Sequence, residues 1–364
     1  MPDRRKIRAG NRARSSIEAG QAGKDAGTLK PKQIRTIYDL AELAGVSAAT
    51  VSRALAGKNV VSNETAERIR KLAQQHGFQP SALARNLRTR RSGAIGVVIP
   101  LGHERAQHIS DPFFMTMIGC LADELTERDF DLVLSRVIPD KPNWLDAMIA
   151  KARVDGFIII GQSDQSAVLD AAARTYLPMV AWGAFTQGQV HCSVGTDNFL
   201  GGRMATEHLI ARGSRDIVFL GNTQAIEIAQ RFEGAKAAAR AAGAAVNLTE
   251  VTIHLASELS AGDIVAYLDS LEHMPDGIFA ASDMIAQTAI QLLATRGLSV
   301  PGDVRVVGFD DLPIARSTVP ALSTIRQDIQ TGAAQMIDCL FRRIGGKQTG
   351  SIVLNPELMV RGTS

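Results

Sequence analysis

The pattern of apolar and polar positions changes once along this 364-residue chain, near residue 94. From that point, short continuous apolar runs alternate with stretches of helical spacing. The apolar runs lie at 94–100, 131–134, 156–161, 178–183, 216–221, 277–281 and 304–309, and the helical stretches lie near 113–128, 143–153, 166–175, 199–212, 231–242, 261–272, 284–296 and 330–344. Apolar strands joined by crossover helices are typical of a parallel sheet covered on both faces. We therefore expect residues 94–364 to form two α/β lobes, with a ligand cleft at the carboxyl ends of the strands.

Residues 36–79 show helical spacing only. Thr36 is a good N-cap with Asp39 three residues on, as in a capping box, and Gly45 is suited to end this first helix. Ser47 can cap a second helix. The apolar positions of the three expected helices are Ile37, Leu40, Ala41 and Ala44, then Val51, Ala54 and Leu55, then Ala66, Ile69, Leu72 and Ala73. Three short helices around one small core predict a helix-turn-helix domain.

The outward side of the expected second helix carries small and hydroxyl-bearing side chains and one long cation. These residues are Ala48, Ala49, Thr50, Ser52 and Arg53. Short hydroxyls and a guanidinium on one exposed face suit phosphates and base edges. The alternative is an ordinary helical hairpin with no nucleic-acid role.

Charge is spread unevenly along the chain. Residues 1–92 hold 19 Lys and Arg against 7 Asp and Glu, whereas the rest of the chain holds 21 against 30. A basic head on an acidic body indicates a polyanionic partner for the head alone. Residues 1–35 have no apolar period and are predicted to be a disordered basic tail, either a solvated extension or a weak contact for DNA phosphates.

The cysteine and apolar content indicates a cytoplasmic protein. Cys120, Cys192 and Cys339 are far apart, with neither metal-ligand spacing nor an even-numbered disulfide framework, which favours a reducing compartment. The polar start has no apolar core of a signal peptide, and no run approaches the ~18 apolar residues of a membrane span, so no membrane partner is expected.

Motifs for catalysis and cofactor binding are incomplete. The segment from Gly161 to Gln165 lacks the final glycine of a nucleophile elbow, and the glycines from Gly195 to Gly202 lack dinucleotide-binding spacing. The sequence therefore predicts no cofactor and no enzyme activity.

Several motifs, in this order and spacing, resemble the lactose-repressor (LacI-type) family of bacterial transcription regulators. They are Thr36-Ile37, Ala44-Gly45-Val46-Ser47, Thr50-Val51-Ser52-Arg53, Ala82-Leu83-Ala84-Arg85-Asn86-Leu87-Arg88, Asp111-Pro-Phe-Phe114, Asp197-Asn198 with Gly201-Gly202, Ser282-Asp283, Gly308-Phe-Asp-Asp311, Ser323-Thr-Ile-Arg-Gln327 and Pro356-Glu-Leu358. The resemblance covers residues 36 to about 362. It implies an N-terminal all-α helix-turn-helix head at 36–79, a hinge helix and linker at 80–93, and a two-lobed core at 94–364 that is similar to periplasmic sugar-binding proteins.

For DNA, the resemblance implies that the second helix lies in the major groove and that paired hinge helices lie in the minor groove, where Leu87 is wedged between base pairs. The residues expected at the DNA are Thr36, Ser47, Ala48, Ala49, Thr50, Ser52, Arg53, Ala84, Leu87 and Arg88. Ala48 and Ala49 depart from many relatives, because alanine can meet only a thymine methyl group. Arg53 is therefore expected to carry much of the direct readout.

For the effector, the resemblance maps ligand contacts onto the core. The positions are Phe113, Phe114, Arg231, Asp283 and Gln327, and Asp111 and Trp182 are further candidates because of their placement at strand ends. Planar polar groups can pair with neighbouring sugar hydroxyls, and aromatic faces can cover the C–H side of a sugar. The alternatives are core packing for Phe113, Phe114 and Trp182, a structural role for Arg231, and a simple N-cap for Asp283.

The sequence thus predicts a homodimeric transcription regulator that binds a palindromic operator and responds to a small-molecule effector. A sugar effector and repression of sugar-utilisation genes are the expected specifics. A periplasmic-type sugar-binding protein without a regulatory role is the alternative, and an enzyme on an α/β scaffold is a third possibility.

Overall fold

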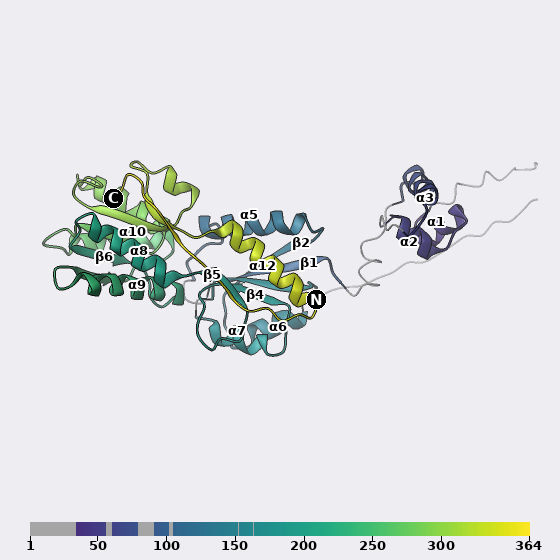
Figure 1. The fold of residues 1–364 in the computed structure, drawn as a ribbon, viewed down its shortest axis with the longest axis horizontal. Helices are drawn as coiled ribbons and strands as arrows, with labels where there is room; N and C mark the ends of the chain where they lie inside the picture. The colour runs from purple at the N-terminus through teal and green to yellow at the C-terminus, as the bar shows by residue number, and fades with distance from the viewer. Residues whose placement is uncertain (1–33, 56–59, 79–90, 102–104, 152, 163) are drawn as a thin grey trace, which may run out of the picture. The chain divides into compact units, whose positions relative to one another are not determined.

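The computed structural model describes residues 34–55, 60–78, 91–101, 105–151, 153–162 and 164–364. The chain divides into two compact units, which we call the head and the core and describe separately (Figure 1). The expected tail at 1–35 and hinge at 80–93 lie almost wholly outside the described residues.

The head consists of three helices, α1 (Ile37–Ala44), α2 (Ala48–Leu55) and α3 (Asn63–Gln75). The capping box at the start of α1 is formed: the Asp39 amide donates to Thr36 Oγ1, and the Thr36 amide donates to Asp39 Oδ2 at 2.9 Å. Gly45 ends α1 with φ of 66°, the left-handed conformation that glycine adopts most easily. The side chains buried between the helices are Leu40, Ala41, Ala44, Val51, Ala54, Ala66, Ile69 and Ala73. The predicted apolar faces thus form the core of the head.

The core contains two six-stranded sheets. The sheet of lobe 1 has the strand order β11-β5-β4-β3-β1-β2, and that of lobe 2 has the order β12-β10-β9-β8-β6-β7. All recorded strand pairs are parallel except the pair of β10 and β12. The predicted α/β fold with parallel sheets is therefore confirmed.

In lobe 1 the helices cover both faces of the sheet. Its elements are β1 (Ala94–Pro100), α5 (Pro112–Thr126), β2 (Asp131–Val137), α6 (Trp144–Lys151), β3 (Gly156–Ile160), α7 (Ser166–Ala173), β4 (Met179–Trp182), β5 (Ser193–Thr196), α12 (Ile329–Ile344) and β11 (Ile352–Leu354). Helices α5 and α12 pack together on one face, and α6 and α7 cover the other (Figure 1).

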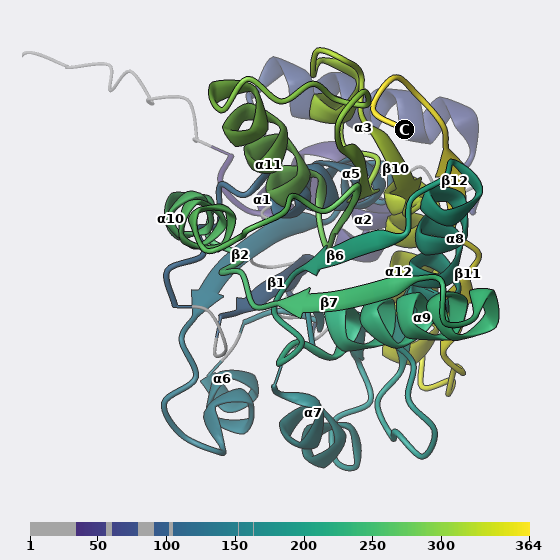
Figure 2. The same ribbon diagram turned by 90° about the vertical axis from the view of Figure 1, so that its left-hand side faces the viewer.

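Lobe 2 repeats this arrangement. Its elements are α8 (Asn198–Ala211), β6 (Asp216–Leu220), α9 (Ile226–Ala242), β7 (Asn247–Val251), α10 (Ser257–Asp269), β8 (Gly277–Ala280), α11 (Asp283–Thr295), β9 (Arg305–Asp310), a 3-10 turn η1 (Pro313–Arg316), β10 (Ser323–Arg326) and β12 (Glu357–Met359). Helices α8 and α9 lie on one face of the sheet, and α10 and α11 lie on the other (Figure 2). The chain passes between the lobes after β5, after β10 and after β11.

The apolar pattern missed five strands. Strand β7 is a half-exposed edge strand, and β11 and β12 have three residues each. Strands β5 and β10 are buried but rich in hydroxyl groups. In β10 these groups find partners inside the lobe, because Thr324 Oγ1 donates to Asp283 and Ser323 Oγ accepts the Arg361 amide. Helix α9 also begins at Ile226, five residues before the predicted start at 231. Among the described residues, no helix combines the length and apolar character needed to cross a bilayer.

Candidate functional site

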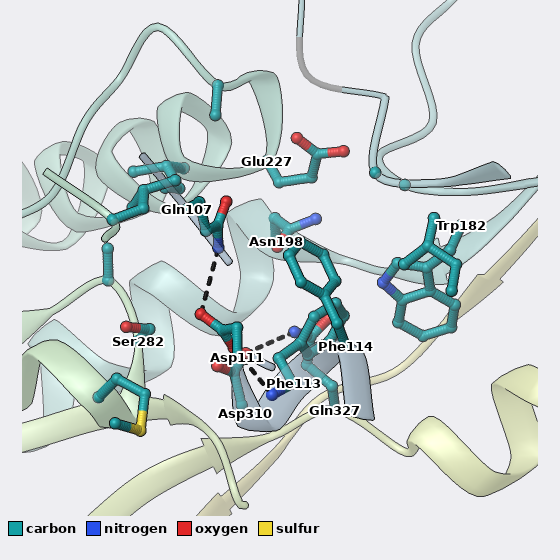
Figure 3. Close-up of a pocket in the computed structure, with 18 of the residues that line it drawn as sticks. Gln107, Asp111, Phe113, Phe114, Trp182, Asn198, Glu227, Ser282, Asp310 and Gln327 are labelled. Atoms are coloured by element: carbon teal, nitrogen blue, oxygen red, sulfur yellow. Dashed lines mark hydrogen bonds between the residues drawn. The ribbon is translucent and has the colours of Figure 1, made fainter. Parts of the chain in front are cut away.

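A cavity of ≈ 130 Å³ lies between the two lobes of the core (Figure 3). Its lining includes residues at or just after the carboxyl ends of strands from both sheets, such as Gly161, Gly183, Thr196, Ser282 and Asp310. This is the edge at which parallel sheets bind ligands. Six of the seven expected effector residues line it, namely Asp111, Phe113, Phe114, Trp182, Arg231 and Gln327.

Asp283 is not in the lining of this cavity. Its side chain has no solvent exposure, and its carboxyl accepts hydrogen bonds from the Leu312 amide at 2.8 Å and from Thr324 Oγ1 at 2.5 Å. Burial, and secondly the nearby Asp310, raise the pKa of Asp283 well above its ordinary value. The structure does not bring Asp283 into the cavity with the other expected residues, and its carboxyl instead braces the segment after β9 at Leu312 and strand β10 at Thr324.

An aromatic wall is formed by lobe 1. The rings of Phe113 and Trp182 lie 6.4 Å apart between centroids, and those of Phe113 and Phe114 lie 5.8 Å apart. Asp111 caps α5, because its carboxylate accepts the Phe113 amide at 2.9 Å and also Gln107 Nε2 at 3.2 Å. Burial raises the pKa of Asp111 despite these bonds.

Arg231 is brought to the cavity by close packing of two helices. Any side chain on Gly202 of α8 would collide with the backbone of Arg231 on α9, so glycine permits this approach. Arg231 Nε donates to Asn198 Oδ1 at 2.9 Å, Nη1 donates to the Ala281 carbonyl, and the guanidinium lies 3.7 Å from the ring centroid of Phe309. Burial lowers the pKa of Arg231, whereas the charges of Asp310 and Glu227 oppose this shift.

Asp310 faces the guanidinium from the end of β9. Its backbone has φ of 122°, a sparsely populated region for a residue with a side chain, which is common at functional sites. Gln327 Nε2 donates to its carboxylate at 2.7 Å. Burial raises the pKa of Asp310 to about 7, against the lowering influence of Arg231.

Six polar lining residues were not among the expected effector contacts, namely Gln107, Thr196, Asn198, Glu227, Ser282 and Asp310. Asn198 lies in a motif used for the resemblance, but no ligand role was attached to it. Glu227 precedes the predicted start of its helix and was therefore read as loop. Had the start of α9 been placed correctly at Ile226, a carboxylate in the first turn of that helix would have indicated Glu227 as a candidate.

Hydrogen bonding in the cavity is incomplete. Among the described residues, Gln107 Oε1 and Thr196 Oγ1 are buried without a hydrogen-bond partner, and both residues belong to the lining. Buried polar atoms are nearly always paired in native proteins. Together with the carboxyl groups of Asp111, Glu227 and Asp310, they give the cavity several polar groups that a ligand can pair with.

In the head, the expected DNA-contacting residues of α2 share one surface. Ala49 and Arg53 are exposed and Thr50 and Ser52 are half-buried, whereas Ala48 packs partly against the core of the head. The hydroxyl of Ser47 pairs with that of Thr50 at 2.9 Å, and that of Thr36 is engaged in its capping box. Ala84, Leu87 and Arg88 lie outside the described residues. Tyr38, which the sequence reasoning did not single out, is 74% exposed on α1.

Comparison with known proteins matches both units of the chain. Residues 36–81 match the model of the bacterial regulatory proteins of the lacI family, and residues 206–364 match a periplasmic binding protein-like domain. The HTH-type transcriptional repressor PurR of Actinobacillus pleuropneumoniae serotype 3 (strain JL03) is 32% identical over 337 residues, which cover 90% of this chain and 97% of the relative.

Two solved structures are similar over the whole length of their chains. The transcriptional regulator CelR in complex with cellobiose is 28% identical with a TM-score of 0.64, covering 90% of this chain and 99% of that chain. The lac repressor dimer bound to operator and the anti-inducer ONPF is 26% identical with a TM-score of 0.75, covering 90% and 98%.

A helix-turn-helix head joined to a two-lobed ligand-binding core defines a DNA-binding transcription regulator. The chain belongs to the lacI family of bacterial regulatory proteins and is a transcriptional repressor of that family.

Proposed function

We propose that this repressor acts in the cytoplasm as a homodimer on a palindromic operator, and that a neutral, hydroxyl-rich effector such as a sugar controls its operator affinity from the cavity. Sugar-utilisation genes are the corresponding targets. The observation that carries the proposal is that two buried polar atoms of the cavity, Gln107 Oε1 and Thr196 Oγ1, have no partner and lie in a lining that also holds three carboxyl groups and an aromatic wall.

The charges of the lining favour a neutral effector over an anionic one. Three carboxyl groups, from Asp111, Glu227 and Asp310, share the lining with the single guanidinium of Arg231. A phosphate or carboxylate on the effector would be repelled by every one of these groups that is ionised and would bring no donor to Gln107 Oε1. A sugar brings several hydroxyl donors, and its C–H face can lie against Phe113 and Trp182. The cellobiose in the CelR complex supports this class of ligand.

The head supports the DNA partner through the exposed side of α2. Arg53 can bind a guanine through two hydrogen bonds, Thr50 and Ser52 suit phosphate or base edges, and Tyr38 extends this set from α1. A two-fold symmetric dimer matches a palindromic site, and the lac repressor dimer on its operator supports this arrangement. The minor-groove role of Leu87 stays a prediction.

A ligand panel tests the effector class. Thermal shift and calorimetry would compare neutral monosaccharides and disaccharides, their phosphorylated counterparts and purine bases. A true effector present at ~100 times its Kd should stabilise the core by roughly 2.7 kcal/mol. Stronger stabilisation by a phosphorylated sugar or by a purine base than by every neutral saccharide would refute the proposal. An Asp310→Asn variant serves as a control, because a ligand of the cavity should lose affinity for it.

A further inference from the structure

A carboxylate of lobe 2 is held by the backbone of lobe 1 at the edge of the cavity. Glu227 lies in the first turn of α9, and its Oε1 accepts a hydrogen bond from the Gln162 amide, 3.3 Å away in the loop after β3. A side chain at Gly183, directly after β4, would collide with this carboxylate and with Gln162. Glycine at 183 therefore permits the two lobes to meet at Glu227.

The lobe 1 side of this contact is rigidly built. Gln162 Nε2 lies 2.8 Å from His191 Nε2, and His191 Nδ1 lies 2.6 Å from Asp170 Oδ1. Gln162 and His191 are buried, and Asp170 also accepts the backbone amides of Val190 and His191. These bonds tie the loop after β3 to α7 and to the segment before β5. The residue whose amide binds Glu227 is thus held, through its side chain, by two other parts of lobe 1.

A second bond joins α9 to lobe 1 about one turn further along the helix, this time to the segment after β4. Gln230 Nε2 donates to the Phe185 carbonyl at 3.1 Å. Glu227 and Gln230 are three residues apart and therefore share one helical face. This face of α9 is the side of lobe 2 that contacts the segment after β4.

Glu227 also belongs to the lining of the cavity, where it is labelled in the close-up (Figure 3). Burial raises the pKa of its carboxyl, while the amide of Gln162 and the charge of Arg231 oppose this shift. Placing an ionisable group here is costly compared with an apolar residue of similar size. Glu227 belongs to lobe 2, contacts lobe 1 and lines the cavity. Its carboxylate can therefore respond both to the arrangement of the lobes and to a ligand in the cavity.

We propose that Glu227 is a latch that holds the two lobes in the arrangement seen here and is open to the effector, so that occupancy of the cavity is passed on as a change in lobe arrangement and in operator affinity. The operator part rests on the proposed function, whereas the latch can be tested without an effector. An effector that places a hydroxyl donor at the carboxylate engages the latch. An effector with a negative charge there is rejected.

The test uses the full-length chain without effector. Spin labels would be attached through an unnatural amino acid at Lys151 in lobe 1 and Glu272 in lobe 2, both exposed. Double electron–electron resonance then reports the distance between the lobes for the wild type, Glu227→Ala and Glu227→Gln. Glu233→Gln is the matched control, because Glu233 is on the same helix, is exposed and pairs only with the nearby Lys236 among the described residues. Circular dichroism checks that each variant is folded.

Glu227→Ala should broaden the distance distribution and add a population with more separated lobes. Glu227→Gln keeps an oxygen for the Gln162 amide and should resemble the wild type, as should Glu233→Gln. An unchanged distribution in folded Glu227→Ala would overturn the latch.

Operator coupling is read in parallel by fluorescence anisotropy, using a duplex that the wild type selects from a random library. Glu227→Ala should change operator affinity at least about fivefold, the lower end of typical allosteric coupling, and the control Glu233→Gln should not. Separated lobes with unchanged operator affinity would overturn the coupling but leave the repressor function of the wild type intact. If the wild type selects no duplex, the proposed function is overturned. The distances between the spin labels would still show whether Glu227 holds the two lobes together.

Discussion

The head and the core place their functional residues in opposite ways. The residues of the head that we propose to contact DNA, as far as the structure describes them, lie between Thr36 and Arg53 within one continuous stretch. The cavity draws its lining from Pro100 through Gln327, and two sheets are needed to bring these residues together. A local site should tolerate changes elsewhere in the fold, whereas a site assembled from distant segments depends on the residues that brace it.

The largest expected effect comes from removing a brace of the core. Asp283→Ala leaves the Leu312 amide and the Thr324 hydroxyl without their acceptor, and each unsatisfied buried group costs about 1–3 kcal/mol. We expect the free energy of unfolding of the core to fall by about 3 kcal/mol, measured by urea denaturation, with the head unaffected. Asp283→Asn keeps an acceptor oxygen and should cost less. An Asp283→Ala core of wild-type stability that binds no effector would show that Asp283 is a ligand contact after all.

A substitution in the head, by contrast, should change the binding of operator DNA and leave the stability of the core unchanged. Arg53→Ala should cost about 1–3 kcal/mol of operator binding and relax the preference at one base pair per half-site. Binding to a set of operator variants at fixed salt measures both effects. Arg68→Ala, an exposed cation on α3, is the control for a general loss of positive charge. If Arg53→Ala distinguishes operator sequences as well as the wild type does, Arg53 is not the residue that reads them.

A pH dependence should appear in the core through Asp310. Its pKa is raised from 3.8 to about 7, so folding favours its protonated form, and its contribution to stability is present below pH 4 and is lost as the pH rises towards 7. Effector hydroxyls donate to the ionised carboxylate, so effector affinity should increase as the pH rises through 6 to 7, by at most about tenfold per unit. Calorimetry across this range measures the trend. Asp310→Asn should flatten it, and an equally steep profile in that variant would assign the titration to another group.

The smallest expected effect comes from a change in the head that should leave effector binding by the core unchanged. Thr36→Ala removes the N-cap of α1 and should destabilise the head by about 1 kcal/mol. Amide hydrogen exchange in α1 to α3 reports this loss, and calorimetry should give an effector affinity equal to that of the wild type. A weaker effector affinity in this variant would mean that the cavity depends on the stability of the head.

The same contrast explains what the sequence could predict. Thr36, Asp39 and Gly45 act on neighbours within a few residues, so the helices of the head follow from spacing alone. The buried apolar strands, such as β3, were equally clear. Strand β10 was missed because Ser323 and Thr324 look polar, and only the fold supplies their partners.

For the cavity, the sequence indicated which residues are candidates better than it indicated what each side chain contacts. Arg231 and Gln327 were placed in a ligand site by resemblance and Asp111 by its expected position at a strand end, and all three line the cavity. Asp283 has the same chemistry, but it is turned towards Leu312 and Thr324, which no spacing along the chain indicates. Glu227 was overlooked because its partner, Gln162, belongs to the other lobe. Contacts between lobes are set by tertiary packing and leave no local pattern.

Operator affinity with and without effector tests the central claim most directly. Fluorescence anisotropy would compare the wild type with Arg231→Ala, using a selected operator duplex and a saturating concentration of the saccharide identified by the thermal-shift panel. The wild type should shift its operator affinity by about 5- to 150-fold, the usual range of allosteric coupling. Arg231→Ala should bind the operator within about twofold of the wild type and show no shift, because the cavity has lost its only guanidinium among the described lining residues. An equal shift in both proteins would place the effector elsewhere and contradict the account.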